Sequence, residues 1–431
     1  MKVKFAHISD IHLGAWHNEN LNKISYQAFN KAIDHFIEEK LDFVIISGDL
    51  YDVSNPKIDV VDLVTKRFKD LIDQEIPIYG IMGSHDFSPS DKSMIRPLIS
   101  AGLFINVSSG EISEDDDKIH LKFVEDPKTK VKLTGLRARK RSLEIEDYRI
   151  LDLKSLEDEV GNKIFIFHTM LSELKPKEYK DMVSAPKSLL PKNFAYYAGG
   201  HLHGTAPKEL GEAGFLNINR RNNIIYPGCL FPTNFRELET LQYGGFCIIT
   251  GEGKESNLDF NVKYVPVKIM DVEKIHLDCS NKNIEEVKNL MSQELARRDV
   301  QDKIVTIRIY GVLSEGKTYE IKTNEIIQIL KEKGAYEVLI NKSALTSKEY
   351  QSVSVITGAS NEEIETTLIH EHVQKSSLDF IPKNKLEEKI NELLPILGVQ
   401  REPETKVMDY NDNLMQSFLG IFEIKDDEDE F

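Results

Sequence analysis

The chain has 431 residues, which is enough for two or three domains with a large buried core. Hydrophobic residues make up 40% and charged residues 29%, as in soluble proteins. No apolar run approaches the ~18 residues that a membrane span needs, so we do not expect the chain to cross a membrane. The formal net charge of −16 counts against a nucleic-acid partner, because phosphate binding usually needs a basic surface.

The N-terminal residues and the cysteines indicate the compartment. The opening MKVKFAHISDIHLG lacks the apolar stretch of a signal peptide and leads directly into a predicted strand. Cys229, Cys247 and Cys279 are far apart and form no CxxC pair, which argues against a disulfide framework or a zinc knuckle. We therefore expect a cytoplasmic protein.

Short apolar runs alternate with longer mixed segments over residues 1–255. The runs are β-branched or aromatic, have the length of strands, and span residues 3–8, 43–47, 76–82, 164–167, 194–198, 224–227 and 245–250. Apolar residues at helical spacing over 28–37 and 60–72 predict helices between the first three strands. This alternation predicts an α/β domain, and further strand-like segments at 119–124 and 131–136 indicate more than one sheet.

Residues 260–345 are predicted to form a separate small domain. Their pattern is a βαβαβ unit, with strands at 261–269, 304–309 and 337–340 and helices at 284–295 and 326–330. Residues 346–382 are polar and are predicted to be a linker.

A helix–loop–helix is predicted over residues 383–424, followed by an acidic tail at 425–431. Its apolar positions are Leu386, Ile390, Leu393, Leu394, Phe418, Leu419 and Phe422. Such a pair has little core of its own, so we expect it to dock on a groove of a partner protein. The alternative is that it packs back on the main body of the chain.

Five short motifs each follow a strand-like run. They are Asp10-Ile11-His12, Gly48-Asp49-Leu50-Tyr51-Asp52, Gly83-Ser84-His85-Asp86, Phe167-His168 and Gly199-Gly200-His201-Leu202-His203. Ligands of α/β folds gather outside the carboxyl ends of the strands, so all five motifs could face one crevice. Each motif alone is weak, since a lone strand-end His or Gly-Asp is usually structural, but five in order are unlikely by chance.

The residue types in these motifs fit a site with two metal ions. Asp and His are natural ligands for manganese, iron or zinc. The two side chains of Asp10-x-His12 can point the same way from an extended strand end, and so can those of His201-x-His203. A two-metal phosphoesterase also needs a carboxylate between ions about 3.5–4 Å apart. Asp49, which follows Gly48 at a strand end, suits that role.

In their order, the motifs resemble those of the calcineurin-like metallophosphoesterase superfamily. Within it, HISDIHLG, SGDLYD, MGSHD and GGHLH together resemble the Mre/SbcD-type DNA double-strand-break repair nucleases. That resemblance implies a β-sandwich flanked by helices (αββα). The small domain is similar to the capping domain of this family. The terminal helix pair is similar to its docking element for a coiled-coil ABC ATPase of the Rad/SbcC type.

The resemblance also implies roles for individual residues. One metal would be held by Asp10, His12, Asp49 and His203. The second would be held by Asp49, His168 and His201, with Ser84 as the remaining ligand. His85 would be the catalytic histidine, which stabilises the transition state or protonates the leaving oxygen while an activated water attacks. Two Mn²⁺ per chain are the cofactors that the family implies.

Two positions depart from the family pattern. Ser84 stands where relatives carry Asn, and a hydroxyl is a shorter and weaker ligand that could bind through water. Asp52 stands where the eukaryotic and some archaeal enzymes carry His and matches the SbcD-like pattern. Asp52 could orient a ligand or a DNA phosphate, and the sequence leaves that choice open.

A DNA partner requires that the net charge be reconsidered. The acidic residues of the tail contribute −5, and two divalent cations would add about four positive charges. The clearest basic cluster for phosphate contacts is Arg137, Arg139, Lys140 and Arg141, with Arg220-Arg221 second. Such clusters are often only solvated.

The expected assembly is a homodimer that forms a heterotetramer with the ATPase. Segments 60–72 and 95–103 are the candidate dimer helices, although their apolar faces could equally pack inside the monomer. The resemblance implies a manganese-dependent DNA exonuclease and endonuclease, nucleoid-associated and from an archaeon. The alternatives are a different metallophosphoesterase, or a non-catalytic subunit that tethers DNA.

Overall fold

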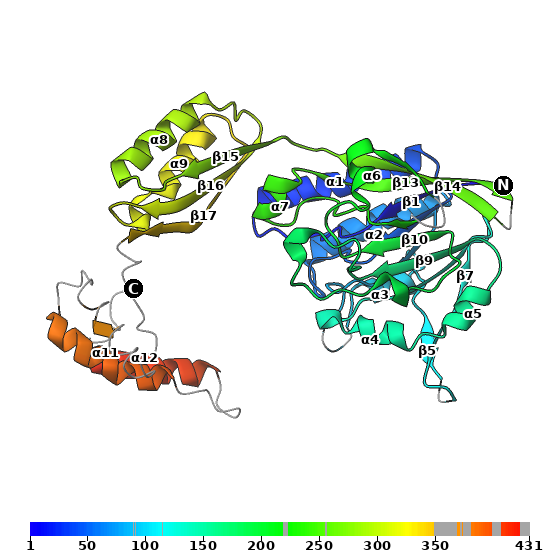
Figure 1. Ribbon diagram of the computed structural model, residues 1–431, viewed down its shortest axis with the longest axis horizontal. Coiled ribbons are helices and arrows are strands. Elements are labelled where there is room, and N and C mark those ends of the chain that lie inside the picture. The colour runs from blue at the N-terminus through cyan, green and yellow to red at the C-terminus, as the bar shows by residue number, and fades with distance from the viewer. Residues whose placement is uncertain are drawn as a thin grey trace. The chain divides into compact units, whose positions relative to one another are not determined.

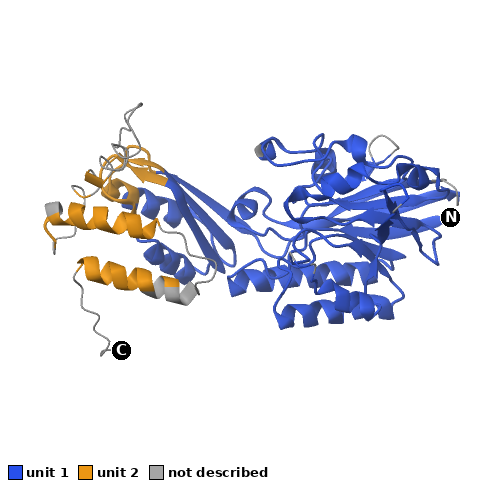
Figure 2. Cartoon of the chain, turned by 90° about the horizontal axis from the view of Figure 1, so that it is seen from below, with its two compact units in different colours: residues 1–278, 288–310, 322–344 blue, residues 279–287, 311–321, 345–431 orange. Residues whose placement is uncertain are grey.

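The computed structural model describes most of the chain. The described residues are 1–88, 90, 92–113, 115–218, 223–254, 257–348, 369–370, 373, 381–398 and 407–422. Arg220-Arg221, most of the predicted linker at 346–382 and the acidic tail at 425–431 lie outside them. Two compact units make up the chain: one contains residues 1–278, 288–310 and 322–344, and the other contains residues 279–287, 311–321 and 345–431 (Figure 2).

A seven-stranded sheet forms one layer of the larger unit. Its strands are β1 (Lys2–Ile8), β2 (Phe43–Ser47), β3 (Ile78–Ile81), β4 (Ile105–Asn106), β11 (Phe215–Asn217), β13 (Gly244–Lys254) and β14 (Asn257–Val267). Their order is β11-β14-β13-β1-β2-β3-β4. Strands β1 to β4 are parallel, while β13 pairs antiparallel with β1 and β14 antiparallel with β13.

A five-stranded sheet forms the second layer. Its strands are β7 (Val124–Glu125), β8 (Lys132–Leu136), β9 (Lys163–His168), β10 (Tyr196–Gly200) and β12 (Ile224–Ile225), in the order β12-β10-β9-β8-β7. The two sheets pack against each other (Figure 1). They share a core that includes Phe5, Phe43 and Tyr79 from one layer and Ile166 and Tyr196 from the other. Strands β2, β9 and β10 are buried along their whole length, which explains their continuous apolar sequences.

Helices cover the outer faces of both sheets. Those of the larger unit outside the small domain are α1 (Glu19–Glu38), α2 (Ile58–Asp73), α3 (Ile95–Ser100), α4 (Glu144–Arg149), α5 (Leu153–Asp158), α6 (Lys208–Ala213) and α7 (Phe235–Thr240). Helices α1, α2 and α3 pack on the larger sheet, and α4 and α5 contribute to the core outside the smaller one. The α/β sandwich flanked by helices is therefore confirmed. A separate hairpin pairs β5 (Gly110–Ile112) with β6 (Ile119–Leu121).

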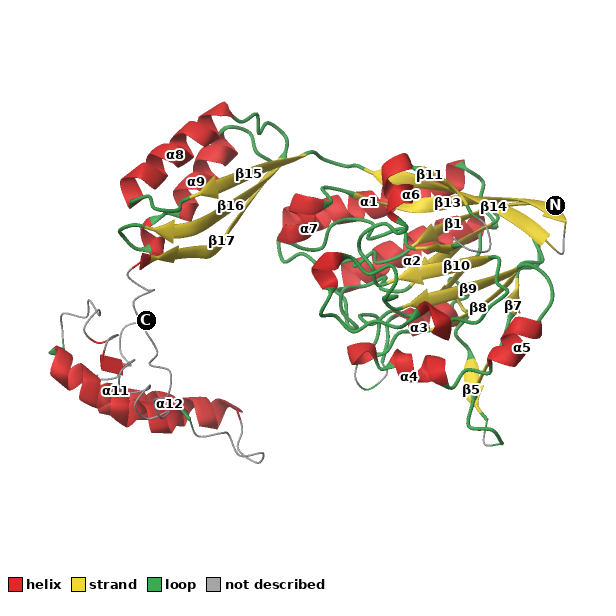
Figure 3. Ribbon diagram, in the orientation of Figure 1, coloured by secondary structure: helices red, strands yellow, loops and turns green. Residues whose placement is uncertain are grey.

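The small domain is a βαβαβ unit that differs from the predicted one at its first strand. Its elements are β15 (Val272–Asp278), α8 (Ile284–Arg297), β16 (Ile304–Leu313), α9 (Thr323–Glu332) and β17 (Glu337–Ser347). Both helices lie on one face of the three-stranded sheet (Figure 3). The strand predicted at 261–269 is β14, which pairs with β13 in the large sheet. The true first strand is β15, in which charged residues alternate with the buried Ile275 and Leu277.

The C-terminal helices are α11 (Lys383–Leu397) and α12 (Val407–Phe422), which pack on each other. Leu386 is buried against Ile369 and Val373, and Ile390, Leu394 and Phe422 pack against the same cluster. Phe418 stacks on Phe422 with ring centroids 4.8 Å apart and keeps 37% of its surface exposed.

Cys229, Cys247 and Cys279 are free thiols, and all three are buried. Among the described residues, no helix combines the length and the apolar character that crossing a membrane requires.

Candidate metal centre

The motif residues meet at one edge of the two sheets. Asp10 and His12 follow β1, and Asp49 follows β2. His168 is the last residue of β9, and His201 and His203 follow β10 in the facing sheet. Because these strands are parallel to their neighbours, their carboxyl ends deliver the side chains to a common place.

One group of ligand atoms consists of Asp10, His12 and His203. The Nε2 atoms of His12 and His203 are 3.1 Å apart, and they lie 4.0 and 3.8 Å from Oδ1 of Asp10. The three ligand atoms all lie within 4.8 Å of one another, which is close enough to hold one cation.

A second group consists of Asp10, Asp49 and His168, all of them buried. Nε2 of His168 lies 3.1 Å from Oδ2 of Asp49, and the same oxygen lies 3.6 Å from Nε2 of His12. Asp49 therefore stands between the two groups, where a bridging carboxylate would be needed.

His201 and Ser84 border these groups. The backbone N–H of His201 donates to both carboxylate oxygens of Asp10, at 3.0 and 3.1 Å, and the His201 ring lies 5.2 Å from that of His168. Ser84 is half-buried directly before His85. The ligand role of Ser84 stays a prediction.

His85 lies at the mouth of the site, with 45% of its side chain exposed. Its backbone N–H donates to Oδ1 of Asp49 at 2.8 Å, and its ring lies 4.8 Å from that of His12. Nδ1 of His85 is 2.6 Å from the backbone carbonyl of Asp52, which fixes the ring when Nδ1 carries the proton. The other ring nitrogen is left for a substrate.

Three of the histidines are oriented through Nδ1. That atom lies 3.2 Å from Oδ1 of Asp52 in His12, 2.7 Å from the carbonyl of Ser47 in His168, and 2.9 Å from Oε1 of Glu237 in His203. Each contact turns Nε2 towards the carboxylates. Metal-binding histidines are usually held in this way, by a carboxylate or carbonyl behind the ring.

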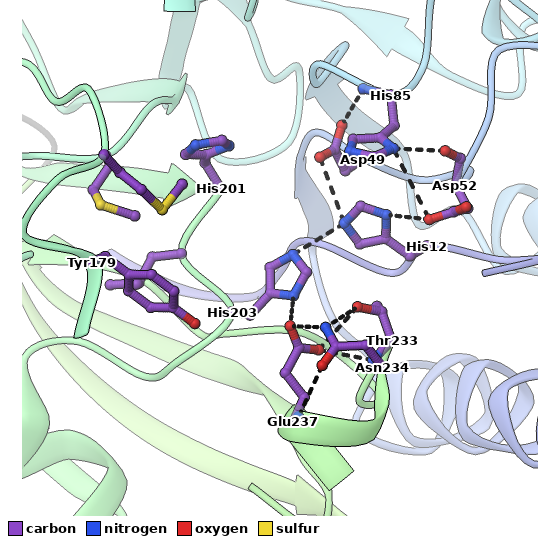
Figure 4. A pocket seen from close by; sticks show the side chains of 13 residues that line it. His12, Asp49, Asp52, His85, Tyr179, His201, His203, Thr233, Asn234 and Glu237 are labelled. Carbon is purple, nitrogen blue, oxygen red and sulfur yellow. Dashed lines mark hydrogen bonds and ion pairs between the residues drawn. The ribbon is translucent and has the colours of Figure 1, made fainter. Parts of the chain in front are cut away.

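Glu237 was not predicted from the sequence. For Asp52 the sequence left open whether it orients a ligand or a DNA phosphate, and in the structure it contacts His12, one of the predicted ligands. The only signal for Glu237 is a helix start, in which Asn234 caps α7 and Glu237 follows three residues later. Figure 4 shows Asp52 behind His12 and Glu237 behind His203.

The charges of the site favour a cation. Burial alone would lower the pKa of His168, but the Asp49 carboxylate raises it to about 10. Burial likewise opposes protonation of His12, and Asp52, Asp49 and Asp10 raise its pKa to about 9. Two buried imidazoles thus take up protons beside carboxylates, which a divalent cation could replace. Nε2 of His168 is also buried without a hydrogen bond of good geometry, as expected of a metal ligand.

The backbone at the site is strained. Asp10, His12, Asp49 and His201 have positive φ angles of 49°, 46°, 52° and 86°, which non-glycine residues rarely adopt. Such strain concentrates where side chains are held for function. Gly83 makes room for the site, because a Cβ there would lie 2.2 Å from Oδ1 of Asp49. These features and the Asp/His donor set fit two divalent cations.

A pocket of about 290 Å³ opens beside the site. His12, His85, His201, His203 and Tyr179 line it (Figure 4). Met170 and Met182 line it as well. Residues of both ligand groups, His12 and His203 of the first and Asp49 of the second, thus line the pocket.

The predicted basic cluster is divided in the structure. The guanidinium of Arg137 and the ammonium of Lys140 lie 5.4 and 5.7 Å from the ring centre of Phe87, two residues after His85. Arg139 instead forms an ion pair of 2.9 Å with Asp147, and Arg141 is exposed. Two of the four basic side chains, Arg137 and Lys140, therefore lie beside the turn that carries His85.

Comparison with known proteins identifies the class. Residues 3–205 match the family model "Calcineurin-like phosphoesterase", so this part of the chain is a calcineurin-like phosphoesterase domain. The match includes all five motifs and confirms the superfamily predicted from them.

The chain is also similar to curated proteins named DNA double-strand break repair protein Mre11. It is 26% identical to that of Methanococcus maripaludis over 68% of this chain and 75% of the relative. It is 28% identical to that of Sulfurisphaera tokodaii over 77% and 78%. It is 23% identical to that of Archaeoglobus fulgidus over 86% and 84%. The resemblance to Mre-type proteins is therefore confirmed and extends beyond the phosphoesterase domain.

Proposed function

We propose that this protein is a DNA nuclease of double-strand-break repair, which hydrolyses phosphodiesters with two divalent cations as exonuclease and endonuclease. The observation that carries the proposal is the pair of ligand groups that share Asp10 and meet at Asp49, with His85 exposed beside them. The Mre11 relatives support DNA as the substrate.

The predicted ligands form two sets, one for each cation. When bound, the two cations supply activation of water and neutralisation of the phosphate charge. Asp10, His12, Asp49 and His203 would hold one cation, and Asp49, His168 and His201 the other. We propose Mn²⁺, because the family resemblance implies it and carboxylate ligands suit it. Ser84 would complete the second set directly or through water.

His85 is the proposed catalytic residue. Its ring is anchored at Nδ1 by the carbonyl of Asp52, so Nε2 can hold or donate a proton to the oxygen that leaves the phosphorus. General acid catalysis of this kind contributes roughly a hundred- to ten-thousand-fold. Asp52 also contacts His12 and so links the acid to a metal ligand.

Arg137 and Lys140 are proposed to contact the DNA backbone next to the cleavage site. The charged groups of both lie near the ring of Phe87, which is 7% exposed and follows His85 by two residues. Phosphate contacts by Arg and Lys position DNA without reading its sequence.

The proposed partner is a coiled-coil ABC ATPase of the Rad/SbcC type, bound by a homodimer of this chain. The helix pair α11–α12 exposes Leu397, Met415 and Phe418, at 53%, 58% and 37%. Leu386 is buried in its own unit, so we assign it to the fold of that unit and place the docking surface on the exposed residues.

Cleavage of labelled duplex and single-stranded DNA with added Mn²⁺ tests the proposal. We expect cleavage by the wild type and a loss of at least about a hundredfold in His85→Gln, with Mn²⁺ binding retained. His120→Gln is the matched control, because His120 is a similarly exposed histidine, on β6.

Two outcomes would favour the alternatives. Wild-type activity no higher than that of His85→Gln would indicate a non-catalytic tethering subunit. Rapid hydrolysis of bis-p-nitrophenyl phosphate without cleavage of DNA would indicate a different metallophosphoesterase.

A further inference from the structure

Helix α7 carries two buried glutamates that point in different directions. Glu237 and Glu239 are two residues apart, so they leave the helix roughly 200° from each other. Their surfaces are 9% and 8% exposed, and buried carboxylates need specific partners. Each of them has such partners, on opposite sides of the helix.

The partners of Glu237 belong to the metal centre and to its own turn. Its Oε1 accepts from Nδ2 of Asn234 at 2.7 Å and lies 2.9 Å from Nδ1 of His203. Its Oε2 accepts from the backbone N–H and the hydroxyl of Thr233, at 2.8 and 2.9 Å. Four contacts therefore fix this carboxylate, and only one of them is to the histidine.

The partners of Glu239 belong to the small domain. Nε of Arg308, on β16, donates to both carboxylate oxygens at 3.1 and 3.0 Å, and Nη2 of Arg308 donates to Oε2. The same guanidinium lies 5.2 Å from the ring centre of Phe235, at the start of α7. His276, on β15, approaches Glu239 at 3.4 Å. All these residues lie in the same compact unit.

We propose that Arg308 and Glu239 are positioning residues for the metal centre: the small domain holds helix α7, and α7 holds His203 through Glu237. This inference rests on the metal site of the proposed function and deepens it by adding residues that touch neither metal nor substrate. The helix has only six residues, and Asn234 caps its N-terminal end. A displacement of Glu239 therefore moves Glu237 as well, because the two are joined by rigid helical backbone.

The proposal predicts a graded loss of metal affinity. Removing a carboxylate behind a metal-binding histidine typically weakens metal binding about ten- to a hundredfold, and we expect this of Glu237→Gln. Arg308→Met keeps most of the length of the side chain but removes the guanidinium group that binds both oxygens of Glu239. We therefore expect a smaller loss of metal affinity, about three- to tenfold. Arg308→Lys retains a charge at Glu239 and should recover part of the affinity.

The experiment is isothermal titration of the full chain with Mn²⁺, without DNA, together with thermal unfolding of the metal-free protein. The matched control is Arg298→Met, since Arg298 pairs with Glu273 and Glu294 inside the small domain and contacts no residue of α7 in those pairs. Arg308→Met should weaken Mn²⁺ binding and Arg298→Met should not. In the double variant Glu237→Gln/Arg308→Met, the two losses should be less than additive, because both act through His203.

The proposal would be overturned by wild-type Mn²⁺ affinity in Arg308→Met or by full additivity in the double variant. Equal losses in Arg308→Met and Arg298→Met would also overturn it, because a general effect of the small domain would explain them. A wild type that binds Mn²⁺ but cleaves no DNA would refute the proposed nuclease and leave this inference standing.

Discussion

The protonation of two buried histidines sets the charge of the metal-free site. His12 and His168 have pKa values of about 9 and about 10, so both are protonated at pH 7 in the absence of metal. In each case burial disfavours the charge, and the neighbouring carboxylates outweigh it. A metal ion needs the neutral imidazole, so it must displace these protons.

We therefore expect metal binding to release about two protons per chain at pH 7, one from each of these two histidines. Titration calorimetry with Mn²⁺ in buffers of different ionisation enthalpy measures this number. In the metal-free protein, the stability contributed by the two raised pKa values is full below pH ~6.5 and is lost as the pH rises through about 9 to 10. Binding that releases no protons would contradict the pKa values given for these two residues.

At this scale the sequence predicted the residues whose chemistry is visible in a motif. Asp10, Asp49 and His203 follow strands and are ligand types, so their convergence could be expected. The sequence does not predict the groups that accept hydrogen bonds from the ring nitrogens of His168 and His203. The carbonyl of Ser47 has no sequence signature, and Glu237 joins His203 only through a tertiary contact across 34 residues.

At the scale of elements, local sequence pattern predicts the helices correctly but does not predict the pairing of β14 with β13. Helices α1 and α2 bury apolar residues at the predicted 3.6-residue spacing. The strand at 257–267 was assigned to the wrong domain, because its pairing with β13 is not encoded in its own alternation. The register, with Ile249 beside Val262, is decided by the neighbouring strand.

The turn after β3 packs tightly against Asp49, which restricts its sequence at Gly83. The backbone N–H of Gly83 donates to Asp86 at 2.8 Å, and Asp86 also accepts from the N–H of Tyr51 at 3.1 Å. This ties the turn that carries His85 to the loop that carries Asp49. A Cβ on Gly83 would lie 2.2 Å from Oδ1 and 2.3 Å from the backbone nitrogen of Asp49, and neither atom has room to move.

Gly83→Ala should therefore displace Asp49, weaken Mn²⁺ binding at least about tenfold and abolish DNA cleavage, at a cost in stability of about 1–3 kcal/mol. Calorimetry, nuclease assays and thermal unfolding measure the three effects. Gly204→Ala is the control, because a Cβ there meets nothing within 4 Å. Wild-type binding and cleavage in Gly83→Ala would show that Asp49 is not held where the structure places it.

At the scale of the whole molecule, one compact unit contains the candidate metal centre, and the described residues of the other form a small apolar core. The second unit has one described apolar cluster outside the small-domain segments, built around Ile369, Val373 and Leu386. Its helices α11 and α12 nevertheless expose large apolar side chains. Exposed apolar residues of this size mark interaction surfaces when they gather on one element, and Met415 and Phe418 are on the same helix.

Phe418→Asp in the full chain should therefore prevent binding of the coiled-coil ATPase proposed as partner and leave Mn²⁺ binding unchanged. An aromatic anchor of an interface typically contributes 2 kcal/mol or more, so we expect affinity to fall at least about thirtyfold. Size-exclusion chromatography and calorimetry with the purified ATPase of the same organism measure this. Glu392→Lys, at an exposed polar position of α11, is the control for a change of charge. Undiminished binding by Phe418→Asp would place the docking surface elsewhere, whereas loss of Mn²⁺ binding in the same variant would show that the two units do not act independently.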